Sequence, residues 1–197
     1  MVSQALDDLR TEHRCMSKLL DLLQGQVRLV GEDRQPDGQL LLEIAEYFAS
    51  FPDLFHHPKE DLILRRLIAR APTDAEALQH LEDEHEEGGR ELKRFMRAVI
   101  RLVLDPEAAT DRFLSAALAF MDSERRHMAW EEESFFSAAE QALLPEDWAE
   151  IDARLKCFIE PLRKQEGRTG YKRINRVVGQ WRSRSPTAPS RLDGEPA

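Results

Sequence analysis

Apolar residues recur at intervals of three and four along four separate stretches of the chain, and this periodicity constrains the fold more than any other feature. The most regular stretch lies between residues 74 and 104. Its inward positions are Leu78, Leu81, His85, Gly88, Leu92, Phe95, Val99 and Leu102. Because an α-helix turns once every 3.6 residues, this spacing places the side chains on one face. Each stretch therefore predicts a long amphipathic helix that buries one side.

Short segments rich in proline, glycine and aspartate separate the four expected helices. We predict helices over residues 3–30, 39–70, 74–104 and 110–143, the last starting near Thr110 or Asp111 and the first capped by Ser3. Pro52 and Pro58 should kink the second helix, because each lacks a backbone N–H. The inward stripe of this helix is expected to include Asp53. Short connections favour antiparallel neighbours, so the sequence predicts an all-α, up-down-up-down four-helix bundle.

A shorter helix and a basic tail are expected after the bundle. The short helix, Trp148 to about Phe158, completes a domain that spans residues 1–158. Residues 159–197 form a C-terminal extension in which nine basic residues and three acidic ones lie from Arg163 onward. One more helix is expected over 170–182, and the rest has the composition of a disordered segment. The extension either covers one end of the bundle or contacts a protein partner.

The composition argues against several classes of function. The 197 residues include 37 acidic and 28 basic ones, so no specific nucleic-acid partner is expected. No apolar run approaches the roughly 20 residues that span a bilayer, and the first residues do not resemble a secretory signal. Two cysteines, Cys15 and Cys157, make no disulfide framework. We therefore expect no membrane span and a cytoplasmic location.

Each predicted bundle helix carries one histidine in its apolar stripe, namely His13, His56, His85 and His127. Glu60 and Glu131 follow the second and the fourth of these histidines by four residues, so each lies on the same helix face as its histidine. One core histidine alone is more often hydrogen-bonded than a metal ligand. Six ionisable groups in one core are costly unless they are paired or ligated, and together they predict a dinuclear metal site.

The spacing also indicates an internal repeat. The pairs Glu12-His13 and Glu84-His85 correspond, as do His56-x3-Glu60 and His127-x3-Glu131. The histidines are 43 residues apart in the first half and 42 in the second. We expect two halves related by a pseudo-two-fold axis, in which each half holds one metal through its two histidines while the two glutamates bridge.

Other polar residues near these stripes are interpreted as lying outside the metal site. A solvated acidic face is expected for Glu12, Glu82, Asp83, Glu84, Glu86 and Glu87. His80 is interpreted as a surface histidine. Glu124 lies one turn before His127 in the same stripe, and it either supports a ligand from behind or takes no part.

These residues resemble the hemerythrin-like family, the bacterial HHE cation-binding domains. The resemblance covers about residues 3–155, and the matching pieces are Glu12-His13, His56-x3-Glu60-Asp61-Leu62-Ile63, Glu84-His85, His127-x3-Glu131 with Phe135-Phe136, and Leu144-Pro145-Glu146-Asp147-Trp148. The resemblance implies a dinuclear non-haem iron centre with an oxo or hydroxo bridge. Such a centre reacts with dioxygen, peroxide or nitric oxide. Zinc or manganese would be substitutes for the iron.

The sequence departs from the oxygen-carrying members of that family at Gly89. Those members have a second histidine there, one turn after the ligand that corresponds to His85. His57 is the best replacement, although on a regular helix it would point about 100° away from His56. The expected ligands are therefore His13, His56, His57, Glu60, His85, His127 and Glu131. An open coordination position would favour redox chemistry over reversible oxygen carriage.

Two functions remain open at this point. The first is a di-iron protein that reacts with these small molecules in oxidative or nitrosative stress, or in oxygen or iron sensing. Its enzymatic version has peroxidase-like, catalase-like or nitric-oxide-handling activity. The alternative is a non-enzymatic metal-dependent sensor or iron-binding protein whose basic tail contacts a partner. Metal storage is disfavoured, because ferritin-like sites use more carboxylates.

Overall fold

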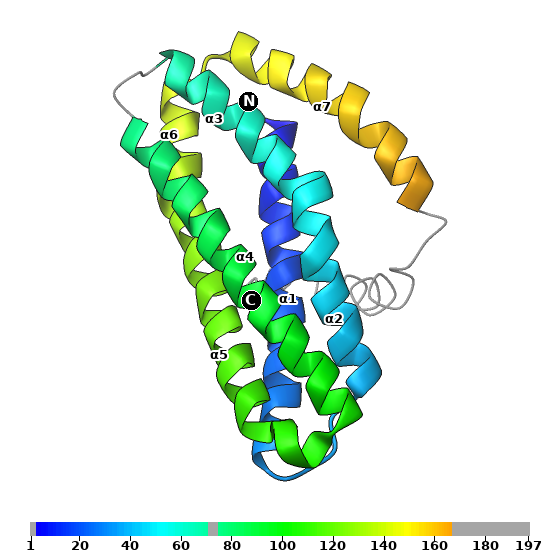
Figure 1. Ribbon diagram of the computed structural model, residues 1–197. Coiled ribbons are helices and arrows are strands. Elements are labelled where there is room, and N and C mark those ends of the chain that lie inside the picture. The colour runs from blue at the N-terminus through cyan, green and yellow to red at the C-terminus, as the bar shows by residue number, and fades with distance from the viewer. Residues whose placement is uncertain (1–2, 71–74, 167–197) are drawn as a thin grey trace, which may run out of the picture.

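The computed structural model describes residues 3–70 and 75–166, and its regular elements in these ranges are all helices (Figure 1). The helix expected over 170–182 and the segment expected to be disordered lie outside the described residues. Within the described part of the chain, no helix is both long and apolar enough to cross a bilayer.

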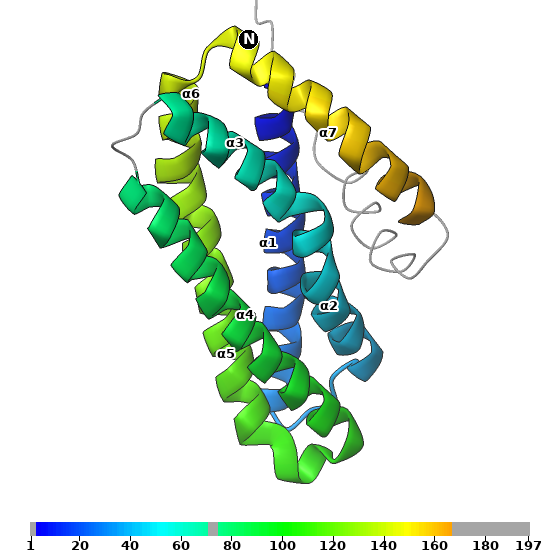
Figure 2. The same ribbon diagram turned by 45° about the horizontal axis from the view of Figure 1, so that its top comes forward.

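Four helical rods lie side by side and alternate in direction, which confirms the predicted bundle (Figures 1 and 2). In chain order the helices are α1 (Gln4–Gly31), α2 (Gly38–Phe51), η1 (Pro52–His56), α3 (His57–Arg70), α4 (Ala75–Leu104), α5 (Pro106–Trp130), η3 (Glu131–Phe135), α6 (Phe136–Ala142) and α7 (Pro145–Glu166). The first and third rods are the single helices α1 and α4. Each of the other two rods consists of three consecutive segments, and α7 packs against α1 and α3 at one end of the bundle.

One helix begins with the predicted cap, and two helices extend beyond the ends predicted from the sequence. Ser3 caps α1 as expected, because its Oγ accepts a hydrogen bond from the Ala5 N–H at 3.2 Å. The fourth rod begins at Pro106, a few residues before the predicted start, since proline suits a first turn where its missing N–H has no partner. Helix α7 continues through Pro161 to Glu166, beyond the end predicted from the sequence. One proline removes only one hydrogen bond from such a long helix.

Both three-part rods contain one wide turn of π-helix. The first is η1, which starts at Pro52 and ends at His56, so the kinks expected from the prolines take this form. The second is η3, which begins at Glu131 and contains no proline, and nothing in the pattern indicated it. The wide turn of η1 changes which side chains face inward. Asp53, expected on the inward stripe, is exposed, whereas Pro52 and Phe55 are buried.

The core consists of two apolar clusters with a polar layer between them. One cluster lies between α1, α2, α4 and α5, toward the end of the bundle that is lowest in Figure 1. Its Phe95 and Phe120 rings stack with centroids 4.8 Å apart. The cluster at the other end includes Leu9 and packs α1 against α3, α6 and α7. On α1, Leu9 belongs to one cluster and Met16 to the other. His13 lies between them, so apolar side chains close the polar layer from both ends.

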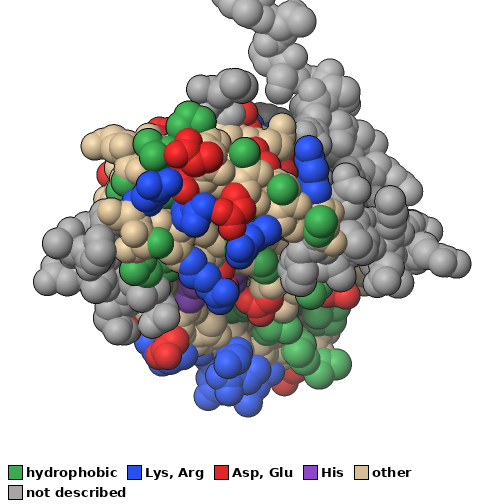
Figure 3. All heavy atoms as spheres, turned by 90° about the horizontal axis from the view of Figure 1, so that it is seen from above, with side chains coloured by type: hydrophobic (Ala, Val, Ile, Leu, Met, Phe, Trp, Pro, Cys, Tyr) green, Lys and Arg blue, Asp and Glu red, His purple; other side chains and the backbone are tan. Residues whose placement is uncertain are grey.

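Asp147 joins the start of α7 to the bundle. Its buried carboxylate accepts hydrogen bonds from Arg70 Nε at 2.8 Å and Nη2 at 3.0 Å, and from the Leu144 N–H at 2.9 Å. Arg66 Nε lies 2.7 Å from the same carboxylate. These hydrogen bonds, that of Arg70 foremost, hold the pKa of Asp147 below its usual range. Figure 3, which views the molecule from above, shows basic and acidic side chains next to one another on this face. Ion pairs also join Glu150 to Arg66 and to Arg154.

Candidate metal centre

The structure brings all seven predicted ligand residues into the polar layer between the two apolar clusters. Their candidate ligand atoms form two groups, and within each group these atoms lie within 4.8 Å of one another. The first group consists of His13, His56, Glu60 and Glu131, and the second of His57, His85 and His127. Contributions come from all four rods, so the site forms only when the bundle is assembled.

Each glutamate in the layer turns one oxygen toward each group. Glu60 Oε1 lies 2.9 Å from His56 Nε2, and Glu60 Oε2 lies 3.4 Å from His85 Nε2. Glu131 Oε2 lies 3.0 Å from His13 Nε2, and Glu131 Oε1 lies 3.1 Å from His127 Nε2. Each carboxylate therefore spans the two groups and could bind a cation in either of them.

Several polar atoms in this layer are buried without a hydrogen bond among the described residues. They are both carboxylate oxygens of Glu60 and Glu131, Nε2 of His85 and both ring nitrogens of His127. Unpaired buried polar atoms are costly, and a bound cation would remove that cost. Ligand atoms bonded to one metal at about 2.0–2.2 Å lie roughly 3–3.5 Å apart. Most separations in this layer are close to that range, so these residues fit a metal.

The charges of the first group favour positive charge in its centre. Burial would raise the pKa of Glu60, but the charge of His56, whose Nε2 lies 2.9 Å away, lowers it well below the usual value. Burial by itself would lower the pKa of His56, because it disfavours the charged imidazolium. The charge of Glu60 and the hydrogen bond to Glu12 outweigh burial and raise it well above the usual value. The pocket therefore stabilises a proton or a metal cation at the same place.

The second group is more open to solvent than the first. The side chains of His57 and His85 are 27% and 22% exposed, whereas those of His13 and His56 are 3% exposed. Burial lowers the pKa of His57 to about 4, so its imidazole is neutral near pH 7 and can bind a metal. A Cβ placed at Gly89 would have no neighbour within 4 Å. Small molecules can therefore approach the second group more easily than the first.

Four histidines of the layer contact a further carboxylate through Nδ1. These pairs are His13 with Glu132 at 3.0 Å, His56 with Glu12 at 3.0 Å, His57 with Asp53 at 3.1 Å and His127 with Glu84 at 3.7 Å. A carboxylate behind a histidine fixes the ring and its tautomer, and leaves Nε2 free for a metal. Sequence reasoning missed these roles. The repeated Glu-His pairs at 12–13 and 84–85 were a signal for Glu12 and Glu84, whereas no repeated motif marked Glu132 or Asp53.

The assignment of Glu12 to a solvated face was wrong. Glu12 is 7% exposed, because α1 turns it toward η1 and Lys59. Asp83 and Glu86 are exposed, as predicted, and His80 is exposed with its ring against Trp130. Lys59 was not singled out by sequence reasoning, yet it is 1% exposed. A lysine on a charged stretch carries no local signal for burial.

Glu124 is partly buried one turn from His127 and lies outside both groups of ligand atoms. Its Oε1 is 3.6 Å from the place where a Cβ of residue 88 would lie. Burial raises the pKa of Glu124 to about 7, and the nearby charge of Glu131 contributes in the same direction. Of its two expected roles, this position fits a supporting group beside the site.

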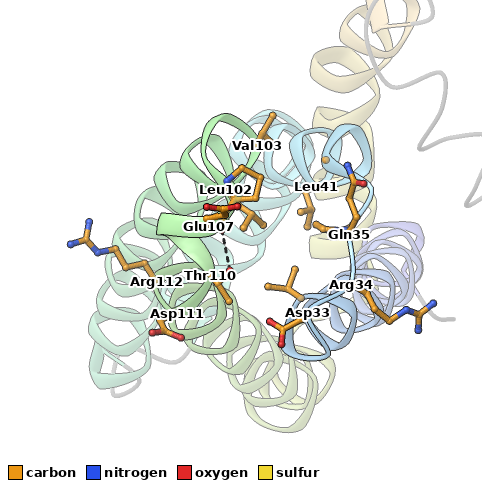
Figure 4. A pocket seen from close by; sticks show the side chains of 14 residues that line it. Asp33, Arg34, Gln35, Leu41, Leu102, Val103, Glu107, Thr110, Asp111 and Arg112 are labelled. Atoms are coloured by element: carbon orange, nitrogen blue, oxygen red, sulfur yellow. Dashed lines mark hydrogen bonds between the residues drawn. The ribbon is translucent and has the colours of Figure 1, made fainter.

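A cavity of about 870 Å³ lies at the other end of the bundle, where the α1–α2 connection meets the start of α5 (Figure 4). Leu41 and Leu102 line it, and Arg34 and Arg112 point away from the opening (Figure 4). No histidine or cysteine lines it, so it offers no counterpart to the ligand groups of the polar layer.

Fold and site together define a class of protein, a four-helix bundle whose core holds a cluster of histidines and glutamates able to bind metal. The chain belongs to the hemerythrin HHE cation-binding domain family, whose model matches residues 4–139. This match confirms the family resemblance inferred from the motifs. Neither curated proteins nor solved structures gave a match to the chain.

Proposed function

We propose that this protein binds two iron ions in the polar layer and uses them to bind and react with dioxygen, peroxide or nitric oxide. The observation that carries the proposal is the pair of bridging positions. Glu60 and Glu131, both fully buried, each direct one oxygen to each histidine group. Membership in a cation-binding family supports metal as the occupant of the layer.

The proposed ligands divide into two sets joined by the glutamates. His13 and His56 would hold one iron, and His57, His85 and His127 the other. Bound iron would supply an exchangeable coordination position and redox equivalents. The residues behind the ligands keep the imidazoles oriented, and the apolar clusters keep bulk water out. The partly exposed second group would admit a small ligand, which favours reaction over a sealed structural site. Both cysteines are free, in keeping with a cytoplasmic location.

Titration of the metal-free protein with ferrous iron under anaerobic conditions tests the proposal. We expect uptake of about two irons per chain and loss of both on combined His56→Ala and His127→Ala substitution. His80→Ala is the matched control, because His80 lies on the same helix as His85 but outside both groups. Uptake of no iron, or uptake that the double substitution leaves unchanged, would overturn the proposal.

A second measurement separates the enzymatic version from the sensor. The iron-loaded protein should consume hydrogen peroxide over many turnovers if it is an enzyme. A sensor would react once per centre and stop. The same protein truncated after residue 166 shows whether the basic extension matters. Unchanged peroxide chemistry with loss of binding to a partner would favour the sensor.

A further inference from the structure

Lys59 is a buried cation directly behind the first histidine group. It is 1% exposed and is among the largest fully buried side chains of the described residues. Its Nζ donates hydrogen bonds to Glu12 Oε1 at 2.5 Å and to the carbonyl oxygen of Phe55 at 2.6 Å. A buried ammonium group persists only with such partners, and its partner here is itself a buried carboxylate.

Glu12 connects this cation to a proposed metal ligand. While Oε1 accepts from Lys59, Oε2 lies 3.0 Å from Nδ1 of His56. With Lys59 on its other oxygen, the Glu12 carboxylate accepts the Nδ1–H of His56. This leaves Nε2 of His56 directed at Glu60 and His13.

In the second half of the bundle, the position that corresponds to Lys59 holds an uncharged residue. The residue three positions after His56 is Lys59, and the residue three positions after His127 is Trp130. Glu84, the counterpart of Glu12, lies 3.7 Å from His127 Nδ1, and its side chain is 21% exposed. The contact between Glu84 and His127 is therefore longer and more exposed to solvent than the contact between Glu12 and His56. Apart from His57, the two halves repeat the same histidine and glutamate positions, but the groups behind those histidines differ.

We propose that Lys59, acting through Glu12, is a positioning residue that makes the two metal positions unequal. The position at His13 and His56 is preformed and binds metal tightly, whereas the position at His57, His85 and His127 binds metal weakly and exchanges it. The inference rests on the proposed dinuclear function.

The physical reason is preorganisation. A ligand whose ring is already fixed by a hydrogen bond loses less freedom when it binds metal, and loss of such a supporting group typically reduces metal affinity by about 10–100-fold. His56 has a short contact to a carboxylate that is itself held by Lys59. His127 has only a long contact to a carboxylate that is 21% exposed. The first metal should therefore bind before the second.

The test titrates the metal-free full-length chain with Co²⁺ in competition with a chromophoric chelator, so that the readout is affinity and stoichiometry. The wild-type chain should show two sites whose dissociation constants differ by about tenfold or more. Lys59→Met, which keeps an unbranched side chain one atom shorter and removes the charge, should weaken the tighter site by about 10–100-fold and leave the weaker site nearly unchanged. Circular dichroism of each metal-free variant checks that it is folded.

Two further variants distinguish positioning from packing. The double variant Glu12→Gln with Lys59→Met removes both charges together, so no buried carboxylate is left without its partner. It should bind the first metal more tightly than Lys59→Met alone. If Lys59 only fills space, the double variant will be no better than the single one. Glu84→Gln is the matched control in the other half and should affect only the weaker site.

The outcomes separate this inference from the proposed function. Two wild-type sites of equal affinity, or a tighter site that Lys59→Met leaves unchanged, would overturn the role of Lys59 while the dinuclear site stands. If Lys59→Met does not fold, the double variant is compared with the wild type instead, and a tighter site that it leaves unchanged would overturn the role of Lys59. Binding of fewer than two metals by the wild-type chain would instead remove the proposed function, and the inference with it.

Discussion

The imidazole rings of His57 and His85 stack with centroids 4.1 Å apart, although they belong to different rods of the bundle. His57 follows directly on the wide turn of η1 and its Nδ1 lies 3.1 Å from Asp53 Oδ1. Its predecessor, His56, belongs to the other ligand group. Two consecutive histidines thus lie in the two different groups, which fits the roughly 100° between neighbours on a helix.

His57→Phe tests whether His57 completes the second metal position. Phenylalanine can keep the stacking against His85 but offers no nitrogen to a metal. We expect one metal per chain to be retained and the second to bind at least about tenfold more weakly, as for loss of one imidazole ligand. Equilibrium dialysis followed by metal analysis measures this. Full occupancy at the wild-type affinity would show that His57 is no ligand.

Gly89→His tests whether a histidine one turn after His85 can act as an additional metal ligand. A Cβ has room there, and the new imidazole would lie near the second group. We expect tighter binding of the second metal by about tenfold, or about 1.4 kcal/mol. Gly89→Ala is the control, because both substitutions remove a helical glycine and both gain up to about 1 kcal/mol of helix stability. Equal metal affinity in the two variants would place residue 89 outside the site.

Metal should stabilise the folded bundle, since the unfolded chain has no assembled site. At free metal 100 times above the dissociation constant, the free energy of unfolding should rise by about 2.7 kcal/mol. Thermal unfolding with Co²⁺ and after chelation measures the difference. The combined His56→Ala and His127→Ala protein should show no such difference. A shift of the same size in that variant would mean that the metal binds elsewhere.

Asp147→Asn should loosen the attachment of α7. The substitution removes a carboxylate that accepts from Arg70 and the Leu144 N–H, and we expect a loss of about 1–2 kcal/mol near pH 7. Because the folded-state pKa of Asp147 is lowered, its stabilisation is complete above the unfolded-state value of about 3.9. It is lost as the pH falls through the folded-state value. Urea unfolding of both proteins at pH 7 and pH 3 should therefore show a difference that shrinks with acid.

Phe120→Ala should destabilise the apolar cluster below the site by about 3–5 kcal/mol, because Phe120 is fully buried and stacks on Phe95. Leu118→Ala is the control, since Leu118 is 49% exposed on the same helix and its loss should change stability by less than about 0.5 kcal/mol. Chemical unfolding of the two variants compares them directly. Equal losses would contradict the burial described for Phe120.

Much of the fold follows from local pattern. The steps of three and four fix four helices, and prolines mark where the second rod changes its turn. The same pattern places four histidines and two glutamates on inward stripes, because a helix has only one face to bury. Local pattern did not reveal η3, where a wide turn opens without proline at Glu131. It also misplaced Asp53, because η1 shifts the face that points inward.

The sequence by itself determined three things. They are the helices, the histidines and glutamates on the inward faces of those helices, and the family to which the chain belongs. Only the tertiary structure decided which charges are buried beside them. Glu12 and Lys59 both look like surface residues on their own helices, and each becomes buried because the other arrives from a neighbouring rod. Burial of a charge depends on partners that are distant in sequence, and no spacing within one helix records them.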